Sequence, residues 1–238
     1  MPWVIPTTNL KTLLVALRLS LLSLMFVVVV VVSPLQAKES SSPKLHRFED
    51  SRVSMACTYT VVVYGPDPKQ LPLITTAALD EVDRIDALMS NYKPESPLSQ
   101  LNREAGEHAV LVEPELFSFL ERCVRYSQQS EGGFDITVGP LMKAWGFFRG
   151  EGRIPWSFEL WNVLRKVGYQ HLHLNSTQRT IQFERSGMEL DLGGIAKGYA
   201  VDRVVELLKE QHIERAFVSA GGSTLYGLGA PQIVRVGK

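Results

Sequence analysis

The spacing of apolar residues changes within residues 188–212 from the period of a strand to the period of a helix. Met188, Leu190 and Leu192 alternate with acidic residues, and this two-residue period predicts a half-buried strand. From Ile195 onwards, apolar residues recur at helical spacing as far as about residue 212. We therefore expect a strand that leads directly into a helix.

Two glycines, Gly193 and Gly194, lie where the period changes. A turn of this kind leaves backbone N–H groups unpaired at the start of the helix, and these groups together with the helix dipole favour an anion. Lys197 follows in the first helical turn, where a cation opposes the dipole unless a negative group lies nearby. The pattern indicates a site for a phosphate-bearing ligand, although a tight turn with an incidental lysine would have the same sequence.

The same analysis predicts the other elements of the chain. Strands are expected at residues 54–64, 169–174, 180–184 and 215–220, and helices at residues 73–91, 114–131 and 155–167. The core should include Leu160, Leu164 and Val167 of the last helix and the aromatic residues Trp145, Phe147 and Phe148.

Two segments between these elements hold residues that suit a ligand. Residues 91–106 are predicted to form a polar loop, which is either a surface connection or a lid whose Tyr92 faces a flat ring. Farther along, Asp135 and Thr137 point to the same side if the chain is extended there. A capping aspartate in a turn is the alternative.

Residues 1–37 are predicted to be a signal peptide. Lys11 and Arg18 form a basic start, the apolar run Leu19–Val32 has 14 residues, and Ala37 offers a small residue for cleavage. A spanning helix needs about 20 residues, but an uncleaved inner-membrane anchor stays open. We expect an exported, periplasmic protein in which a polar linker at 38–53 precedes a domain at 54–238.

Composition narrows the functional classes. The 238 residues carry 25 basic and 25 acidic side chains, and this zero net charge argues against non-specific nucleic-acid binding. Cys57 and Cys123 match no metal or redox spacing and are interpreted as buried thiols, with a disulfide as the alternative. No phosphate-binding Walker pattern is present, and no hydrolase-type pair of nucleophile and histidine is convincing.

Five segments are specific when they are taken together in order. They are Met55-Ala-Cys-Thr, Met89–Asn102, Gly132–Gly146, Leu190–Asp202 and Ala220-Gly-Gly. In this order they resemble the ApbE family, the FAD:protein FMN transferases, over about residues 54–229. The implied fold is α+β, with helices packed on a mixed or antiparallel sheet in the family's T-fold, incomplete at the C-terminus.

The resemblance also implies an activity. Family members use Mg²⁺, cleave the pyrophosphate of FAD and attach FMN to a threonine hydroxyl of an acceptor protein, typically a membrane electron-transfer subunit. Some members instead hydrolyse FAD to FMN and AMP. The alternative from a different class is an exported protein that binds or scavenges FAD without transferase activity, or an inactive remnant.

The family's ligand contacts map onto matching positions of this chain. The implied FAD contacts are Met55, Tyr92, Gly133, Phe134, Asp135, Asp191 and Lys197. Gly194 matches a metal ligand and would bind Mg²⁺, a hard cation, through its carbonyl oxygen. Asp191 could contact adenine or ribose, or act as the base toward the acceptor hydroxyl, and the binding role is favoured. No catalytic residue is assigned.

The chain departs from the family pattern at three points. No lipobox cysteine follows the apolar run, which favours a soluble or signal-anchored form over a lipoprotein. Met55-Ala56-Cys57 replaces the usual Met-Gly-Thr. Family members continue beyond the equivalent of Lys238 with a His-x-x-Asp-Pro motif and further metal ligands. The resemblance therefore predicts a fragment or a truncated copy with an open sheet edge.

Overall fold

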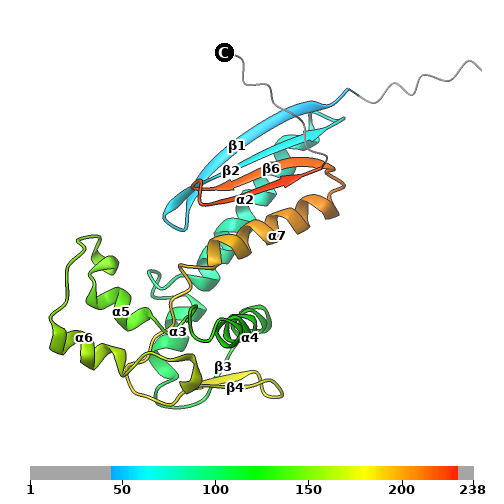
Figure 1. Ribbon diagram of the computed structural model, residues 1–238. Helices are drawn as coiled ribbons and strands as arrows, with labels where there is room; N and C mark the ends of the chain where they lie inside the picture. The colour runs from blue at the N-terminus through cyan, green and yellow to red at the C-terminus, as the bar shows by residue number, and fades with distance from the viewer. Residues whose placement is uncertain (1–43, 230–238) are drawn as a thin grey trace, which may run out of the picture. The chain divides into compact units, whose positions relative to one another are not determined.

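The structure is a computed structural model that describes residues 44–229, in which helices pack on two antiparallel sheets (Figure 1). This architecture confirms the predicted α+β class. In chain order the elements are β1 (His46–Ser54), β2 (Cys57–Gly65), α2 (Gln70–Met89), α3 (Pro97–Glu104), β3 (Val110–Leu111), α4 (Pro114–Gln129), α5 (Gly139–Ala144), η1 (Phe147–Arg149), α6 (Ser157–Leu164), η2 (Tyr169–His171), β4 (Leu172–Asn175), β5 (Thr180–Phe183), α7 (Ala196–Glu210), β6 (Arg215–Ala220) and β7 (Thr224–Leu228).

The larger sheet has the strand order β1-β2-β6-β7, and α2 and α7 lie side by side against one of its faces (Figure 1). Alternate residues of the two central strands face these helices and are buried, among them Tyr59, Val61 and Val218. The smaller sheet has the order β3-β5-β4. Its antiparallel pair β4 and β5 corresponds to the strands predicted at 169–174 and 180–184, except that residues 169–171 form η2. Within residues 44–229, no helix has both the length and the apolar character that a membrane crossing needs.

The long helices and central strands agree with the apolar periodicity. Helix α2 corresponds to the helix predicted at 73–91, and its apolar stripe of Ile74, Ala78, Val82, Ile85 and Met89 is below one tenth exposure. Helix α4 begins at Pro114, where the predicted helix 114–131 begins, and the proline occupies its first turn. Cys57 and Cys123 are both free thiols, and only Cys123 is fully buried.

Strand β1 corrects the predicted linker at residues 38–53. Every residue of β1 pairs with β2, from His46 opposite Gly65 to Ser54 opposite Cys57. The strand lies at the edge of the sheet, where charged side chains remain in water and protect the edge from further pairing. This polar composition is the reason that the sequence favoured a linker. The predicted signal peptide at 1–37 lies outside the described residues.

The β1–β2 turn corrects the start of the strand predicted at 54–64. Met55 and Ala56 form this two-residue turn with φ angles of 48° and 57°. Two residues with positive φ match the twist of the strands that they join. Strand β2 therefore begins at Cys57, and the side chain of Met55 lies at the tip of a hairpin.

Helix α3 corrects the loop predicted at residues 91–106. Ser96 caps the helix by accepting a hydrogen bond from the backbone N–H of Ser99 at 3.0 Å, and Pro97 occupies the first turn. Leu98 and Leu101 are buried beneath it. The Ser-Pro sequence that suggested a loop is instead the start signal of a short helix.

The segment that carries α5, η1 and α6 corrects the predicted core. Trp145 and Phe147 are exposed, and Phe148 is only half-buried. Helix α6 spans residues 157–164 rather than 155–167 and contains no fully buried residue. Leu164 is exposed, whereas Leu160 and Val167 are half-buried. The helical period was correct, but periodicity does not tell which face of a helix has a partner.

Three helices are joined by a network of charged groups around Arg84. Arg84 on α2 donates to Glu81 at 2.8 Å and to Glu115 on α4 at 2.7 Å. The hydroxyl of Tyr199 on α7 donates to the other oxygen of Glu115, also at 2.8 Å. The hydrogen bond from Arg84 is the main reason why the pKa of Glu115 lies below its usual value. The ionised carboxylate therefore stabilises the folded state.

This network predicts a pH-dependent effect of Glu115→Gln. Because the pKa of Glu115 is lower in the folded state, its contribution is present above the unfolded pKa and is lost as the pH falls through the folded value. We expect a loss of about 1 kcal/mol in the free energy of unfolding at pH 7, measured by urea titration. The loss should shrink as the pH falls through the folded-state pKa of Glu115, because the parent carboxyl then becomes neutral as well. The exposed Glu107→Gln is the control, and a loss that stays constant down to acid unfolding would contradict the assignment.

Candidate functional site

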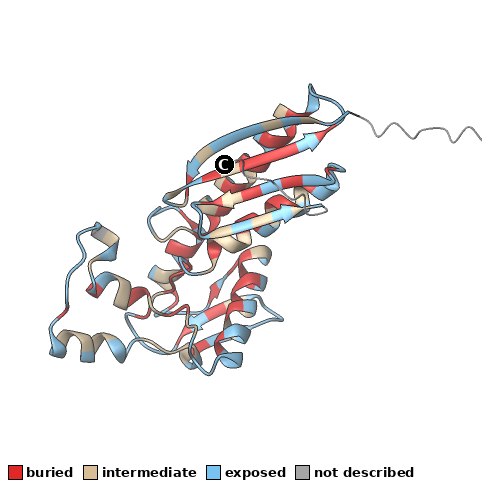
Figure 2. Cartoon of the chain, turned by 45° about the horizontal axis from the view of Figure 1, so that its top comes forward, coloured by how far each residue is buried: buried red, intermediate tan, exposed pale blue. Residues whose placement is uncertain are grey.

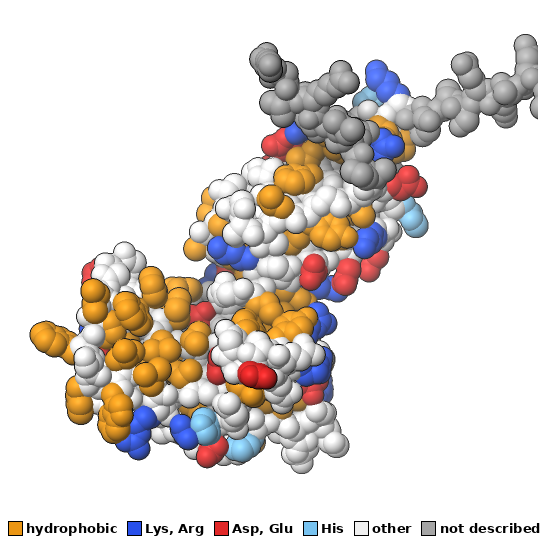
Figure 3. Space-filling view, in the orientation of Figure 1, with side chains coloured by type: hydrophobic (Ala, Val, Ile, Leu, Met, Phe, Trp, Pro, Cys, Tyr) orange, Lys and Arg blue, Asp and Glu red, His pale blue; other side chains and the backbone are white. Residues whose placement is uncertain are grey.

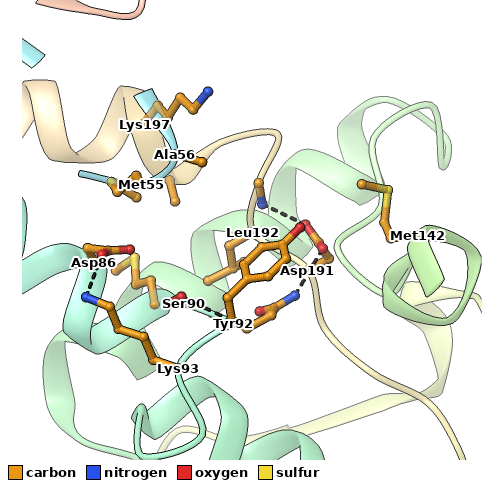
Figure 4. Close-up of a pocket in the computed structure, with 14 residues that line it drawn as sticks. Met55, Ala56, Asp86, Ser90, Tyr92, Lys93, Met142, Asp191, Leu192 and Lys197 are labelled. Carbon is orange, nitrogen blue, oxygen red and sulfur yellow. Dashed lines mark hydrogen bonds and ion pairs between the residues drawn. The ribbon is translucent and has the colours of Figure 1, made fainter. Parts of the chain in front are cut away.

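A cavity of about 250 Å³ opens beside the β1–β2 turn (Figure 4). Its walls come from segments that are far apart in the sequence: the β1–β2 turn, the end of α2 with the residues after it, α5, and the turn that leads into α7. The lining residues are Met55, Ala56, Asp86, Met89, Ser90, Asn91, Tyr92, Lys93, Met142, Asp191, Leu192, Gly193, Ala196 and Lys197. Four of the predicted FAD contacts are therefore brought together: Met55, Tyr92, Asp191 and Lys197.

Asp191 is held from both sides. Its Oδ1 accepts a hydrogen bond from the backbone N–H of Gly193 at 2.7 Å, and its Oδ2 accepts one from Nδ2 of Asn91 at 3.0 Å. The residue is buried although it lines the cavity. The first contact fixes the turn before α7, and the second ties that turn to the end of α2.

Asn91 is a cavity residue that the sequence did not single out. Its Nδ2 is used by Asp191, whereas its Oδ1 is buried and accepts no hydrogen bond from residues 44–229. A buried acceptor without a partner costs about 1–3 kcal/mol. The amide therefore offers an acceptor that a ligand donor or a bound water would satisfy.

The extended segment before α7 corrects the strand predicted at residues 188–192. Met188, Leu190 and Leu192 are buried as their alternation predicts. The segment pairs with another segment at a single bridge, between Glu189 and Val138. The side chain of Asn102 takes the place of a neighbouring strand: it accepts from the Leu190 N–H at 2.7 Å and donates to the Leu190 carbonyl at 2.9 Å.

Tyr92 forms one side of the cavity entrance. Its ring stacks on Phe148, with centroids 4.6 Å apart and planes inclined by 25°. Burial raises the pKa of Tyr92, and the nearby carboxylate of Asp191 adds to the effect, so the phenol is protonated at neutral pH. The Nζ of Lys143 lies over the ring of Phe148, 5.4 Å from its centroid, and forms an ion pair with Glu189. Phe148, expected in the core, instead supports the aromatic wall.

Lys197 lines the cavity from the first turn of α7. Figure 4 shows its amine directed away from Asp191 and Tyr92. Among the described residues, the ion pairs of this region use Lys93 with Asp86 and Lys143 with Glu189, and none of them includes Lys197. The amine is therefore available to an anion at that end of the cavity.

Gly133, Phe134 and Asp135 do not line this cavity. Asp135 Oδ1 accepts from the N–H and the hydroxyl of Thr137 at 2.8 and 2.6 Å, and Oδ2 accepts from the Tyr169 N–H at 2.9 Å. This geometry matches the alternative of a capping aspartate in a turn. The turn still contributes indirectly, because the carbonyl of Ile136 within it accepts from the Asp191 N–H at 2.7 Å.

Gly194 lies in the exposed turn before α7, with no atom within 4 Å of the position that a Cβ would occupy. Within residues 44–229, no group of three or more His, Cys, Asp or Glu side chains is placed to hold a metal ion. The described side chains do not by themselves provide a cage for Mg²⁺, and we derive no chemical step through a metal.

Two further cavities lie on either side of the first cavity's neighbour Phe148, which lines both of them. One, of about 190 Å³, shares Asn91 with the first cavity and is also lined by Asn102, Lys143 and Glu189. The other, of about 410 Å³, lies between Phe148 and Arg153. Since pockets for drug-sized ligands span about 300–1,000 Å³, the first cavity alone suits part of a dinucleotide rather than all of it.

The chain belongs to the ApbE family, because the family's sequence model, described as "ApbE family", matches residues 55–237. The FAD:protein FMN transferase of Treponema pallidum is 32% identical over 162 residues, which cover 64% of this chain and 44% of that protein. The transferase of Escherichia coli K12 is 28% identical over 193 residues, which cover 78% and 55%. The chain therefore spans about half the length of the relatives that it matches.

Solved structures agree with this membership. The flavin transferase ApbE from Vibrio cholerae matches with a TM-score of 0.71 and 27% identity, over 79% of this chain and 61% of that chain. The ApbE protein of Thermotoga maritima matches with a TM-score of 0.70 and 28% identity, over 78% and 60%. The α+β fold is thus the fold of this family.

The double hydrogen bond of Asn102 predicts a clear effect of Asn102→Ala. The change leaves both polar groups of the Leu190 backbone without their partner, so we expect the free energy of unfolding to fall by about 1–3 kcal/mol in a urea titration. Asn162→Ala removes the same side chain from α6 and should change stability by less than about 0.5 kcal/mol. Similar losses in the two variants would refute the role given to Asn102.

Proposed function

We propose that this chain contributes the FAD site of an FAD:protein FMN transferase that moves FMN to a threonine hydroxyl of an acceptor protein. The observation that carries the proposal is the convergence of Met55, Tyr92, Asp191 and Lys197 on one cavity. The family motifs in the sequence imply these four residues as FAD contacts. The residues come from four separate segments of the chain. Membership of the ApbE family supports the same proposal.

The chemical character of the walls suits a flavin nucleotide. Methionine and tyrosine side chains offer polarisable and aromatic surface to a flat ring. At the other end, Lys197 and the first N–H groups of α7 suit a phosphate, because the helix dipole and the ammonium group attract the same anion. The remainder of the dinucleotide would extend from this cavity toward the one with which it shares Asn91.

The proposed reaction exchanges one phosphate bond for another. The threonine oxygen attacks the phosphorus of the FMN half, the bridging P–O bond breaks, AMP leaves and the hydroxyl proton passes to a base. Negative charge increases on the bridging oxygen, and a fixed lysine stabilises that charge. Both oxygens of Asp191 already accept hydrogen bonds, from Gly193 and Asn91, and this favours a role in binding over a role as the base.

Several finer features belong to the proposal. Mg²⁺ would supply charge neutralisation at the pyrophosphate, with the carbonyl of Gly194 as one oxygen ligand. Gly133, Phe134 and Asp135 are retained as FAD contacts in the ligand-bound state. The acceptor is proposed to be a membrane electron-transfer subunit in the periplasm or an equivalent exported space.

The proposal predicts that Lys197→Ala weakens FAD binding. Loss of one charge-assisted contact to phosphate should raise the dissociation constant about tenfold, because such contacts contribute about 1.5–3 kcal/mol. Flavin fluorescence titration measures the change. Lys209→Ala, at the exposed end of the same helix, is the matched control. Equal affinity of Lys197→Ala and the parent would remove Lys197 from the site.

Transferase activity can be tested directly. Incubation of the full chain with FAD, Mg²⁺ and a threonine-bearing acceptor should yield a fluorescent acceptor band on a denaturing gel. A matched acceptor with valine in place of the threonine should stay dark. Bound FAD without a fluorescent band would select the alternative, an FAD-binding or scavenging protein that lacks transferase activity.

The proposed location can be tested separately. If residues 1–37 are a cleaved signal peptide, the exported protein should begin at or near Lys38 when its intact mass is measured. A mass that includes the apolar run would support the anchored form instead. Recovery of the protein only from the cytoplasm would rule out both forms of the export proposal.

A further inference from the structure

An aromatic patch lies on the segment that carries η1 and α6. We define the patch as Phe147, Ile154, Trp156, Phe158, Trp161 and Leu164. All six side chains are exposed, and the exposed fraction reaches 85% for Ile154, 82% for Trp156 and 76% for Phe158. Figure 3 shows a concentration of apolar side chains over the α5–α6 region, at the lower left of the molecule. Contiguous exposed apolar surface of this kind marks an interaction site.

Helix α6 turns its apolar side chains outwards. Phe158, Trp161 and Leu164 follow one another at intervals of three residues and are exposed, whereas Leu160 and Val163 between them are half-buried. Figure 2 shows this helix without any fully buried residue. The apolar outer face therefore does not serve the packing of the domain itself.

Basic residues accompany the patch. Residues 143–166 contain five basic and two acidic residues. Lys143 and Arg153 form ion pairs with Glu189 and Glu159, so the basic charge near the patch comes mainly from the end of α6. Arg165 lies over the ring of Trp161 at 4.9 Å, and Arg185 donates to the carbonyl of Arg165 at 2.8 Å. Together with Lys166 they form a basic cluster at the C-terminal end of α6.

The form of the patch favours a lipid surface over a protein partner. All six patch side chains are at least half exposed, so the patch presents protruding apolar side chains to its partner surface. Tryptophan and phenylalanine with neighbouring arginine and lysine are typical of helices that lie in the headgroup region of a membrane. The positive charge complements an anionic headgroup.

We propose that the aromatic patch docks this domain on the surface of an anionic lipid bilayer. The aromatic side chains enter the headgroup region, and Arg165, Lys166 and Arg185 contact headgroup phosphates. The docked α6 lies along the membrane plane and does not cross the bilayer. The proposal is independent of flavin transfer, since it uses none of the residues that line the first cavity.

The tryptophans of the chain allow a direct test. Three of the four tryptophans are Trp145, Trp156 and Trp161, so Trp3→Phe in the full chain leaves fluorophores only at or beside the patch. Vesicles of phosphatidylcholine, with and without phosphatidylglycerol, carry brominated acyl chains that quench nearby tryptophan. We expect quenching and a shift to shorter wavelength with the anionic vesicles, both reduced by added salt.

A matched pair of double variants separates the patch from the N-terminal apolar run, which all of the proteins retain. The double variant Ile154→Ser with Phe158→Ser keeps every patch tryptophan. It should raise the lipid concentration needed for half-maximal quenching at least about tenfold, because two apolar side chains that would enter the bilayer are lost. Val53→Ser with Leu73→Ser changes two residues that are equally exposed outside the patch and should leave quenching unchanged.

The charge contribution is tested with Lys166→Gln, which should weaken binding to anionic vesicles about fivefold. Absence of quenching with anionic vesicles, or equal quenching with neutral ones, would overturn the proposal. It would also be overturned if the two double variants lost quenching equally. Concentration-dependent dimerisation that requires Ile154 and Phe158, without quenching by lipid, would assign the patch to a second copy of the chain.

Discussion

The cavity depends on the contacts that hold the extended segment 188–192 in place, because this segment belongs to neither sheet. Backbone groups that are buried must find partners, and the Leu190 N–H and carbonyl find both of theirs in the side-chain amide of Asn102. From that anchor, the next N–H, of Asp191, reaches the Ile136 carbonyl, and its carboxylate joins Gly193 to Asn91. One amide on α3 thus fixes the meeting point of α2, α5 and α7.

The same arrangement explains why the site is only partly satisfied without a ligand. The carboxylate of Asp191 has both oxygens engaged, whereas Oδ1 of Asn91 beside it has no donor among the described residues. Tyr92 is exposed over most of its surface but is oriented by its stack on Phe148. The walls are therefore set in advance, and the free hydrogen-bonding capacity is confined to a few atoms. Such preorganisation reduces the entropy that a ligand must lose on binding.

Periodicity predicted the elements whose packing is regular. A single apolar face gives a clear periodicity, and this periodicity predicted helices α2 and α7 and strands β2 and β6. Strand β1 was missed because an edge strand carries polar side chains. Helix α3 was missed because Ser96-Pro97, which was interpreted as part of a loop, is the N-terminal cap and first turn of the helix. The exposure of Trp156 and Phe158 could not be predicted, since hydrophobicity indicates burial only when a partner surface exists.

Motif matches found four cavity residues, but not the amides that hold them. Asn91 and Asn102 contact residues that lie 100 and 88 positions away in sequence. A polar residue in a loop-like segment gives no local sign of such a contact. Conversely, Asp135 matched a binding motif, and its oxygens are used within its own turn. Sequence reasoning located residues that line the cavity better than the side chains that keep them in place.

The turn between β1 and β2 requires an unfavourable backbone conformation. Ala56 adopts φ of 57°, in the left-handed region that costs about 1–2 kcal/mol for a residue with a Cβ. Met55 beside it adopts the same conformation. This chain therefore stores conformational strain in two consecutive residues at the mouth of the cavity. Such strain persists only where the surrounding structure maintains it, and here the paired strands β1 and β2 hold both residues in place.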